Sequence, residues 1–237
     1  MEKKILGILG GMGAQASDVF YHKIIDATKV EKDQDHLDVL LWSHASIPDR
    51  TAMIEEGRTE ELWNVFAEDV ALLQRAGCSY LAIPCNTSHY FQDRFHAMMG
   101  DGFLNMIDRA AQYAASHCGH RIGILATDGT VCSDLYGQAL AKYGAQCVYP
   151  DANDQAVVMS VIYDEIKKGE KGSLDRFLRV LEGMQAKGCD AVILACTELS
   201  VLKSNYTELQ IPYCLDALDV LTKCCILACG GNYCGTL

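Results

Sequence analysis

The fold is decided by a stretch of sequence that occurs twice. Residues 77–87 read GCSYLAIPCNT and residues 188–198 read GCDAVILACTE, at a constant separation of 111 positions. A second pair reads KILGIL at residues 4–9 and HRIGIL at residues 120–125, at a separation of 116 positions. Solenoid units repeat every 20 to 50 residues or so. A repeat as long as this one therefore indicates a duplicated half-molecule.

Each copy contains short apolar runs that alternate with longer segments of helical periodicity. Continuous apolar strands separated by helices are typical of parallel sheets with helices on both faces. We expect strands at residues 4–10, 38–43, 80–84, 103–107, 121–126, 146–149 and 191–195, and helices at residues 59–76, 173–187 and 218–229.

The predicted fold class is therefore α/β, with two pseudo-symmetric lobes and an active-site cleft between them. Each lobe is expected to be a parallel sheet flanked by helices. The first lobe is predicted to comprise residues 1–105 and 212–237 and to carry Cys85. The second is predicted to comprise residues 106–211 and to carry Cys196. The run at 218–229 is expected to cross back to the first lobe.

Composition excludes several classes of protein. The 237 residues are 50% hydrophobic and carry 20 Lys and Arg against 31 Asp and Glu, a net charge of −11. Such an acidic chain with no basic run is a poor partner for nucleic acid. No apolar stretch reaches the length of a membrane span, and the N-terminal apolar run is too short for a secretory signal. We expect a cytoplasmic protein that binds neither nucleic acid nor membrane.

The 12 cysteines form no C-x-x-C pair of the kind that marks zinc or thioredoxin-type sites. Without an export signal, a disulfide scaffold is not expected. Most of these cysteines, including those in the apolar run at 224–229, are interpreted as small buried hydrophobic residues. No ligand cluster for a metal is visible in the sequence.

Two cysteines differ from the rest. Cys85 and Cys196 occupy equivalent positions in the repeat, each just past an apolar strand and before a helix start. Ligands of open α/β sheets bind at the carboxyl ends of strands, and a helix N-terminus favours a thiolate. Two such thiols on opposite walls of one cleft would provide what stereoinversion requires, a base on each side of one carbon.

A packing role is the competing interpretation. Cys78 and Cys189 match under the same offset of 111 positions, yet they precede their strands, where packing is expected. For the pair at the strand ends, beside polar residues, we favour the catalytic interpretation.

Four motifs resemble those of the aspartate/glutamate racemase superfamily. They read PCNTSH at residues 84–89, ACTEL at 195–199, GGMG at 10–13 and SIPDR at 46–50. The last two resemble the aspartate racemase branch. The sequence has Ala195 where the family usually has Gly before the second cysteine, and Ala14 and Ser17 where it usually has Pro and Thr. Glu198 stands where glutamate racemases have His, which also favours the aspartate branch.

The resemblance implies two α/β lobes, a two-base mechanism with one Cys per lobe and no cofactor, and a homodimer. It also implies that Lys167, at a helix end, binds substrate, although Lys168 is a competing candidate and two lysines also suit any helix C-terminus.

The remaining candidate substrate-binding residues are interpreted from their chemistry. Asn86, Thr87 and Thr197 offer donors to a carboxylate or to the enolate-like charge formed at Cα. The planar guanidinium of Arg50, in a loop beyond a strand, suits bidentate binding of a carboxylate. A solvated loop arginine is the competing interpretation, and the family resemblance favours the binding role. The glycine turn with Met12 is expected to shape the floor of the cleft. Glu198 would either tune the site or cap a helix start.

Other reactions remain open. Gly11, Gly13 and Ala16 fit a G-x-G-x-x-A dinucleotide fingerprint, but the second strand ends without the acidic residue that binds ribose. Isomerases, hydantoin racemases and decarboxylases of this superfamily use related cysteines, and a binding protein could keep the scaffold. We favour a racemase of a small acidic amino acid, aspartate or possibly glutamate, in which Cys85 and Cys196 are the two bases.

Overall fold

The computed structural model describes residues 4–206 and 213–237. It divides into two compact units, one formed by Met1–Met106 with Leu218–Leu237 and one formed by Ile107–Ala217. Each unit is an α/β domain with one parallel sheet flanked by helices. The α/β class with two parallel sheets is thereby confirmed.

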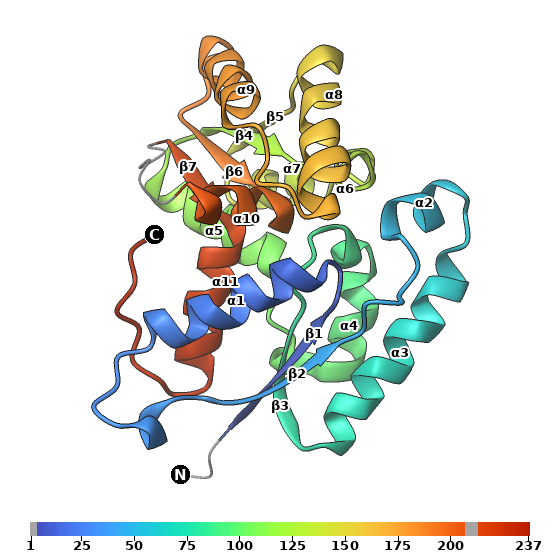
Figure 1. The fold of residues 1–237 in the computed structure, drawn as a ribbon, viewed down its shortest axis with the longest axis vertical. Helices are drawn as coiled ribbons and strands as arrows, with labels where there is room; N and C mark the ends of the chain where they lie inside the picture. The colour runs from blue at the N-terminus through green and yellow to red at the C-terminus, as the bar shows by residue number, and fades with distance from the viewer. Residues whose placement is uncertain (1–3, 207–212) are drawn as a thin grey trace. The chain divides into compact units, whose positions relative to one another are not determined.

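The sheet of the first unit has three parallel strands in the order β2-β1-β3 (Figure 1). They are β1 (Ile5–Gly10), β2 (Asp38–Ser43) and β3 (Cys78–Ala82). The central strand β1 is buried along nearly its whole length, whereas the edge strand β2 alternates between exposed and half-buried residues. Burial on both faces explains why β1 reads as one continuous apolar run.

Helix α3 (Thr59–Arg75) covers this sheet with an apolar stripe. Its buried residues Leu62, Phe66 and Val70 recur at the spacing of one face of a helix. The Phe66 ring lies 5.6 Å from Phe91 and 5.5 Å from Phe95, measured between ring centroids. The other helices of the first unit are α1 (Ala14–Ala27), α2 (Arg50–Glu55), α4 (Gln92–Met99) and α11 (Ala217–Ala228), with 3-10 turns at Asp33–Asp35, Thr87–Phe91 and Gly100–Gly102.

The sheet of the second unit has four parallel strands in the order β5-β4-β6-β7. They are β4 (Arg121–Leu125), β5 (Gln146–Val148), β6 (Ala191–Leu194) and β7 (Cys214–Asp216). In both units the first strand of the chain lies between the second and the third. The shared order is what a duplicated half-molecule predicts.

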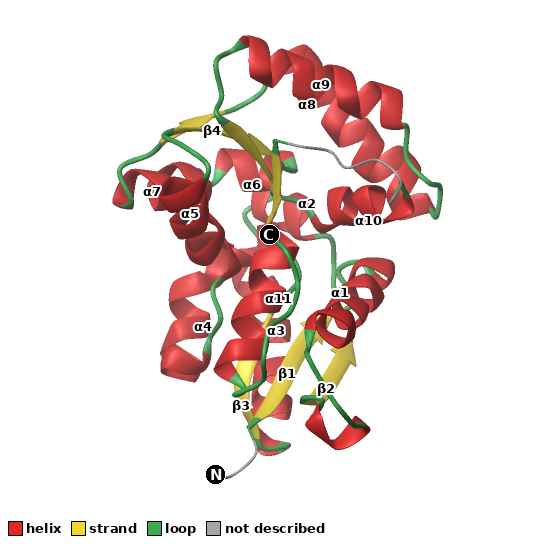
Figure 2. Ribbon diagram, turned by 90° about the vertical axis from the view of Figure 1, so that its left-hand side faces the viewer, coloured by secondary structure: helices red, strands yellow, loops and turns green. Residues whose placement is uncertain are grey.

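Helices α8 (Ala152–Ser160) and α9 (Leu174–Ala186) lie side by side in the second unit (Figure 2). After α8 the helix continues through a π-helical turn at Val161–Glu165 and a 3-10 turn at Ile166–Lys168. The other helices are α5 (Met106–His117), α6 (Asp128–Cys132), α7 (Leu135–Lys142) and α10 (Thr197–Asn205).

The strand predicted at 103–107 is wrong. Phe103 makes a single parallel bridge to Leu81, and helix α5 begins at Met106. The run is apolar because Met106, Ile107 and Ala110 form the buried face of that helix. In the other unit, Cys214 of β7 pairs with Val192 at the corresponding place. Where the second sheet has a fourth strand, the first unit therefore has a single bridge.

The strand β7 also corrects the expected extent of the first lobe. Residues 212–237 were predicted to return to that lobe, but Cys214–Asp216 pairs with β6 in the second sheet. The chain returns to the first unit later, at Leu218, the second residue of α11. The predicted boundary between 211 and 212 lies outside the described residues, as do residues 1–3.

No helix within 4–206 or 213–237 is long and apolar enough to cross a membrane. Over the same residues, no group of three or more His, Cys, Asp or Glu side chains could hold a metal ion.

Candidate active site

Cys85 lies three residues beyond β3, at the carboxyl edge of the first sheet, and is 6% exposed. Its backbone N–H donates to the carbonyl of Ile83 at 2.8 Å, so the chain turns sharply there. The 3-10 turn Thr87–Phe91 then begins directly after Asn86. The thiol thus lies between the end of a strand and the start of a helical turn, as the sequence predicted.

His89 supports the Cys85 loop from beneath. The backbone N–H of Met106 donates to Nε2 at 3.1 Å, so Nε2 carries no proton. The protonated Nδ1 then donates to the carbonyl of Cys85 at 2.9 Å. Burial lowers the pKa of His89 to about 4, against a small opposing effect of the Cys85 carbonyl. His89 is therefore a neutral support whose two ring nitrogens are already engaged.

The lowered pKa of His89 predicts that the folded protein loses stability in acid. Below about pH 6.5 an unfolded chain protonates His89, whereas the folded chain resists protonation until about pH 4. The free energy of unfolding should fall by about 3 kcal/mol as the pH drops through this window. Urea unfolding at several pH values checks this. The variant His89→Gln should flatten the dependence, whereas His22→Gln, at an exposed side chain, should leave it unchanged; an identical slope in His89→Gln would refute the assignment.

The other candidates of the first unit lie around Cys85. Asn86 and Thr87 are both buried and follow it directly. Met12 is 2% exposed, and its sulfur accepts a bond of 3.4 Å from the hydroxyl of Ser88. Met12 and Cys85 belong to the same cluster of buried side chains. The turn after β1 and the turn after β3 therefore meet at one place.

Arg50 is a buried cation with one unpaired edge, that of Nε. It begins helix α2, which Asp49 caps by accepting the N–H of Ala52 at 3.0 Å. Its Nη1 donates to the carbonyls of Ile47 and Pro48 at 3.2 and 3.0 Å. Its buried Nε has no hydrogen-bond partner within the described residues. A buried donor without a partner costs about 1 to 3 kcal/mol, so this edge suits an incoming carboxylate.

Helix α2 packs against the 3-10 turn Thr87–Phe91. Ile47, three residues before Arg50, lies in the same buried cluster as Met12 and Cys85. The structure thus brings all the candidates of the first unit into one neighbourhood.

Cys196 lies two residues beyond β6 and directly precedes helix α10. Its thiol donates to the carboxylate of Glu198 at 3.0 Å, and Thr197 donates to the same oxygen at 3.4 Å. Burial raises the pKa of the Cys196 thiol well above its ordinary value, and the charge and hydrogen bond of Glu198 raise it further. The Glu198 N–H and the charge of Lys167 oppose this rise. Cys196 therefore rests as a thiol, ready to donate a proton.

Removing the Glu198 charge should lower the pKa of Cys196, so the thiolate should form at lower pH. We expect Glu198→Gln to react with a small alkylating agent at lower pH than the unmodified protein. Alkylation of Cys196, followed against pH by mass spectrometry, measures the change. Cys189, whose pKa is raised chiefly by burial and which has no bond to Glu198, is the internal control. A pH dependence of Cys196 alkylation unaltered by the substitution would contradict this role of Glu198.

The two competing lysines have different surroundings. Lys168 pairs with Asp164 at 3.1 Å, and both side chains are more than 60% exposed. Lys167 instead places its ammonium 4.0 Å above the centre of the Tyr163 ring, near enough to Cys196 for its charge to act on that thiol. A π-helical turn lies between α8 and Lys167, and such turns are frequent at functional sites. The structure brings Lys167, and not Lys168, to the Cys196 site.

The turn after β1 argues against a dinucleotide site. Gly11 has a φ of +91°, and a Cβ there would lie 2.4 Å from the backbone of His44. The backbone of His44 therefore occupies the space beside Gly11 that a pyrophosphate would need in a dinucleotide site. No acidic residue ends β2.

The other equivalent cysteines have a packing environment: Cys78, predicted to precede its strand, is the first residue of β3, and Cys189 lies two residues before β6. The sulfur of Cys78 lies 3.0 Å from where a Cβ on Gly7 would be, and that of Cys189 lies 3.4 Å from the same point on Gly123. Burial raises the pKa of both thiols. In each unit this cysteine fills the space beside a glycine of the central strand.

Sequence reasoning missed polar groups that only the fold brings together. Ser200 donates to Asp216 at 2.6 Å, and both are buried at the carboxyl edge of the second sheet. The buried Tyr136 lies near enough for the charges of Asp216 and Cys196 to act on it. In the first unit, Asp69 accepts from Trp42 and bonds to His44, each at 2.7 Å. These partners are far apart in the sequence, so no local spacing marks them.

The chain is similar to known proteins in both sequence and fold. A family model described as Asp/Glu/hydantoin racemase matches residues 9–225. A broad specificity amino-acid racemase from Bacillus subtilis is 23% identical over 224 residues, which cover 92% of this chain and 95% of the relative. Among solved structures, an aspartate racemase from Picrophilus torridus is 29% identical with a TM-score of 0.77, covering 97% and 96% of the two chains. An aspartate racemase homologue from Pyrococcus horikoshii shares the fold, with a TM-score of 0.75 at 21% identity over 96% and 99% of the chains.

Proposed function

Since this chain belongs to the Asp/Glu/hydantoin racemase family, we propose that it interconverts L- and D-aspartate by a two-base mechanism without a cofactor. The observation that carries the proposal is the pair of buried cysteines, Cys85 and Cys196, at equivalent strand ends of the two units. Inversion at Cα needs one group to remove a proton and a second to deliver one to the opposite face. The duplicated fold supplies one thiol for each task.

In one direction, the Cys85 thiolate takes the α-proton and becomes a thiol. The electron pair left on Cα is delocalised into the α-carboxylate as an enolate. The Cys196 thiol then delivers its proton to the other face and becomes a thiolate. The bond from Cys196 to Glu198 supports its part as the donor in the resting protein. For the other enantiomer the two thiols exchange roles.

The charges near the thiols support an acidic substrate. Besides Glu198, which bonds to Cys196, each unit holds a cation and a neutral donor among its candidate residues: Arg50 and Asn86 in the first unit, Lys167 and Thr197 in the second. Developing negative charge at an enolate is stabilised by such preorganised donors. The unpaired edge of Arg50 is assigned to the side-chain carboxylate, and Lys167 with Thr197 to the α-carboxylate. The aspartate racemase of Picrophilus torridus among the similar structures supports the same substrate class.

The proposal is tested by chiral chromatography with purified protein, a chelator and no added cofactor. Both enantiomers of aspartate, glutamate, alanine and lysine are offered separately. We expect either enantiomer of aspartate to become a racemic mixture. Equal turnover of all four amino acids would replace aspartate by a broad substrate class. Racemisation of none of them, with turnover of a hydantoin or a decarboxylation substrate instead, would reject the proposed reaction.

We further propose that the protein acts as a homodimer, as the family resemblance implies, and that it is located in the cytoplasm, where its cysteines stay reduced.

A further inference from the structure

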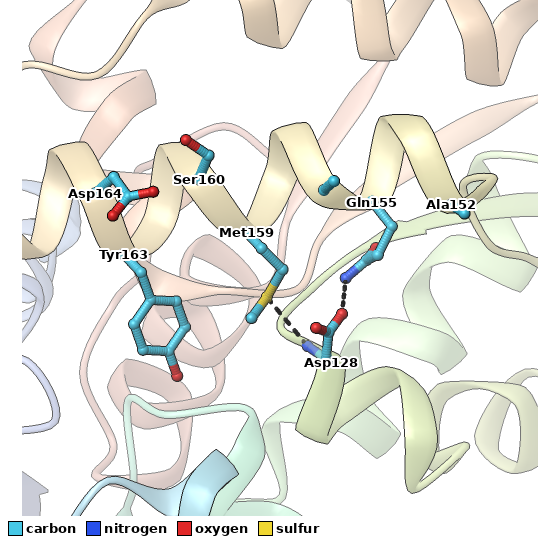
Figure 3. A pocket seen from close by; sticks show the side chains of 8 residues that line it. Asp128, Ala152, Gln155, Met159, Ser160, Tyr163 and Asp164 are labelled. Carbon is cyan, nitrogen blue, oxygen red and sulfur yellow. Dashed lines mark hydrogen bonds between the residues drawn. The ribbon is translucent and has the colours of Figure 1, made fainter.

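A pocket of about 520 Å³ lies in the second unit between helix α8 and the start of α6 (Figure 3). Its polar lining includes Asp128, Gln155, Ser160, Tyr163 and Asp164. None of these residues was singled out from the sequence as a site residue.

The loop that leads to Asp128 of the pocket and the loop that carries Cys196 leave the sheet at the same edge. The N–H of Ala195 donates to the carbonyl of Leu125 at 2.8 Å, at the point where β6 and β4 end together. The chain then leads from Ala195 directly to Cys196, and from Leu125 within three residues to Asp128. Adjacent strands lie about 4.8 Å apart. The two loops therefore leave the same edge of the sheet side by side.

Tyr163 makes a second connection between the pocket and Cys196. Its ring lines the pocket and also lies 4.0 Å from the ammonium of Lys167. Lys167 is near enough to act on the Cys196 thiol through its charge. Tyr163 and Lys167 thus connect the pocket with the Cys196 site.

The carboxylate of Asp128 is held in a fixed orientation. The Nε2 of Gln155 donates to it at 2.7 Å and to the carbonyl of Ala126 at 3.0 Å, as Figure 3 shows for the first of these bonds. The sulfur of Met159 accepts the Asp128 N–H at 3.3 Å. The Oε1 of Gln155 is buried and has no partner among the described residues. The side-chain amide of Gln155 therefore orients Asp128 through its N–H, although its own buried oxygen is left unpaired at a cost in free energy.

The second carboxylate of the pocket is already neutralised. Asp164 pairs with Lys168 at 3.1 Å on an exposed part of the helix. Across the part of the chain that the structure describes, Asp128 forms no ion pair. Its carboxylate is therefore available to a cation that enters the pocket.

The groups assigned so far leave one part of the substrate without a partner. Arg50, Lys167, Thr197 and the Asn86–Thr87 pair all suit carboxylates. An amino acid also brings an ammonium group with three donors, which needs acceptors. We propose that Asp128, oriented by Gln155, binds the α-ammonium group of the substrate. The inference rests on the proposed function, because it assumes an amino-acid substrate beside Cys196.

The test compares two ligands that differ in the amino group alone. Aspartate carries the ammonium, whereas succinate has the same two carboxylates without it. Binding of both is measured by calorimetry with the unmodified protein and with Asp128→Asn. We expect the substitution to weaken aspartate binding by about 10-fold or more, as for loss of a hydrogen bond between charged groups, and to leave succinate binding within about 2-fold.

Two further variants separate binding from folding. Asp164→Asn removes the other carboxylate of the pocket and should leave aspartate binding unchanged. Gln155→Met releases Asp128 but keeps its charge, and it should weaken aspartate binding less than Asp128→Asn does.

Unchanged aspartate binding by Asp128→Asn, or an equal loss for aspartate and succinate, would overturn the inference even if the unmodified protein racemises aspartate. Binding of aspartate that depends on Asp128, in a protein that racemises no amino acid, would instead support the inference and reject the proposed reaction. Failure of the unmodified protein to bind any amino acid would overturn both.

Discussion

Replacing either Cys85 or Cys196 by alanine is expected to lower racemisation of aspartate by about 10³-fold or more in both directions. General acid–base groups contribute roughly 10²- to 10⁴-fold, and inversion needs both groups in the same turnover. Initial rates from each enantiomer, followed by chiral chromatography, measure the loss. Each variant should unfold with nearly the same midpoint as the unmodified protein, since a small buried side chain is replaced by another.

The repeat offers a matched control for this pair. Cys78 and Cys189 occupy the other equivalent cysteine positions and are also buried. Cys78→Ala and Cys189→Ala should therefore remain active. Full activity in Cys85→Ala or Cys196→Ala, or an equal loss in all four variants, would contradict the assignment of the two bases.

Replacing Arg50 by glutamine is expected to lower kcat/KM for aspartate by about 100-fold. The unpaired edge of its guanidinium, that of Nε, would make a bidentate pair with the side-chain carboxylate of aspartate. A hydrogen bond between charged groups is worth about 1.5 to 3 kcal/mol. Most of the effect should be in KM, because the side-chain carboxylate does not change charge during the reaction. Steady-state kinetics in both directions gives this division.

Arg50→Lys keeps the charge but not the planar pair of donors, so it should recover only part of the affinity. Succinate inhibition should weaken in Arg50→Gln, in contrast to the expected behaviour of Asp128→Asn. An unchanged KM for aspartate in Arg50→Gln would show that this buried cation has another role.

The repeat made much of the fold predictable. Apolar runs gave strand positions within a few residues for β1 to β6. The run is continuous in β1, β4 and β6, because strands buried on both faces leave no room for polar residues. The prediction failed where an apolar run belongs to a helix, at Met106 and Ile107, and where a strand has only three residues, at Cys214–Asp216. In such short segments the period cannot distinguish a strand from one turn of helix.

The candidate site was predictable only where a position repeats. Cys85 and Cys196 were singled out because both copies carry them at a strand end. Their roles stay a prediction that the variants above test. Cys196 and Glu198 are only two residues apart, but whether their side chains meet depends on the geometry of the first turn of α10, which the sequence does not show.

Asp128 and Gln155 show the limit of the sequence. They are 27 positions apart, and nothing in their spacing marks the bond that the packing of α8 creates.

The most direct measurement of the central claim follows L-aspartate in D2O with the unmodified protein, by proton NMR at Cα and by chiral chromatography. In a two-base mechanism the proton removed by one thiol differs from the proton delivered by the other. Early in the reaction, D-aspartate should therefore carry deuterium at Cα, while the remaining L-aspartate keeps its proton. Deuterium that enters L-aspartate without formation of D-aspartate, or in equal amounts in both enantiomers from the start, would contradict the two-cysteine mechanism.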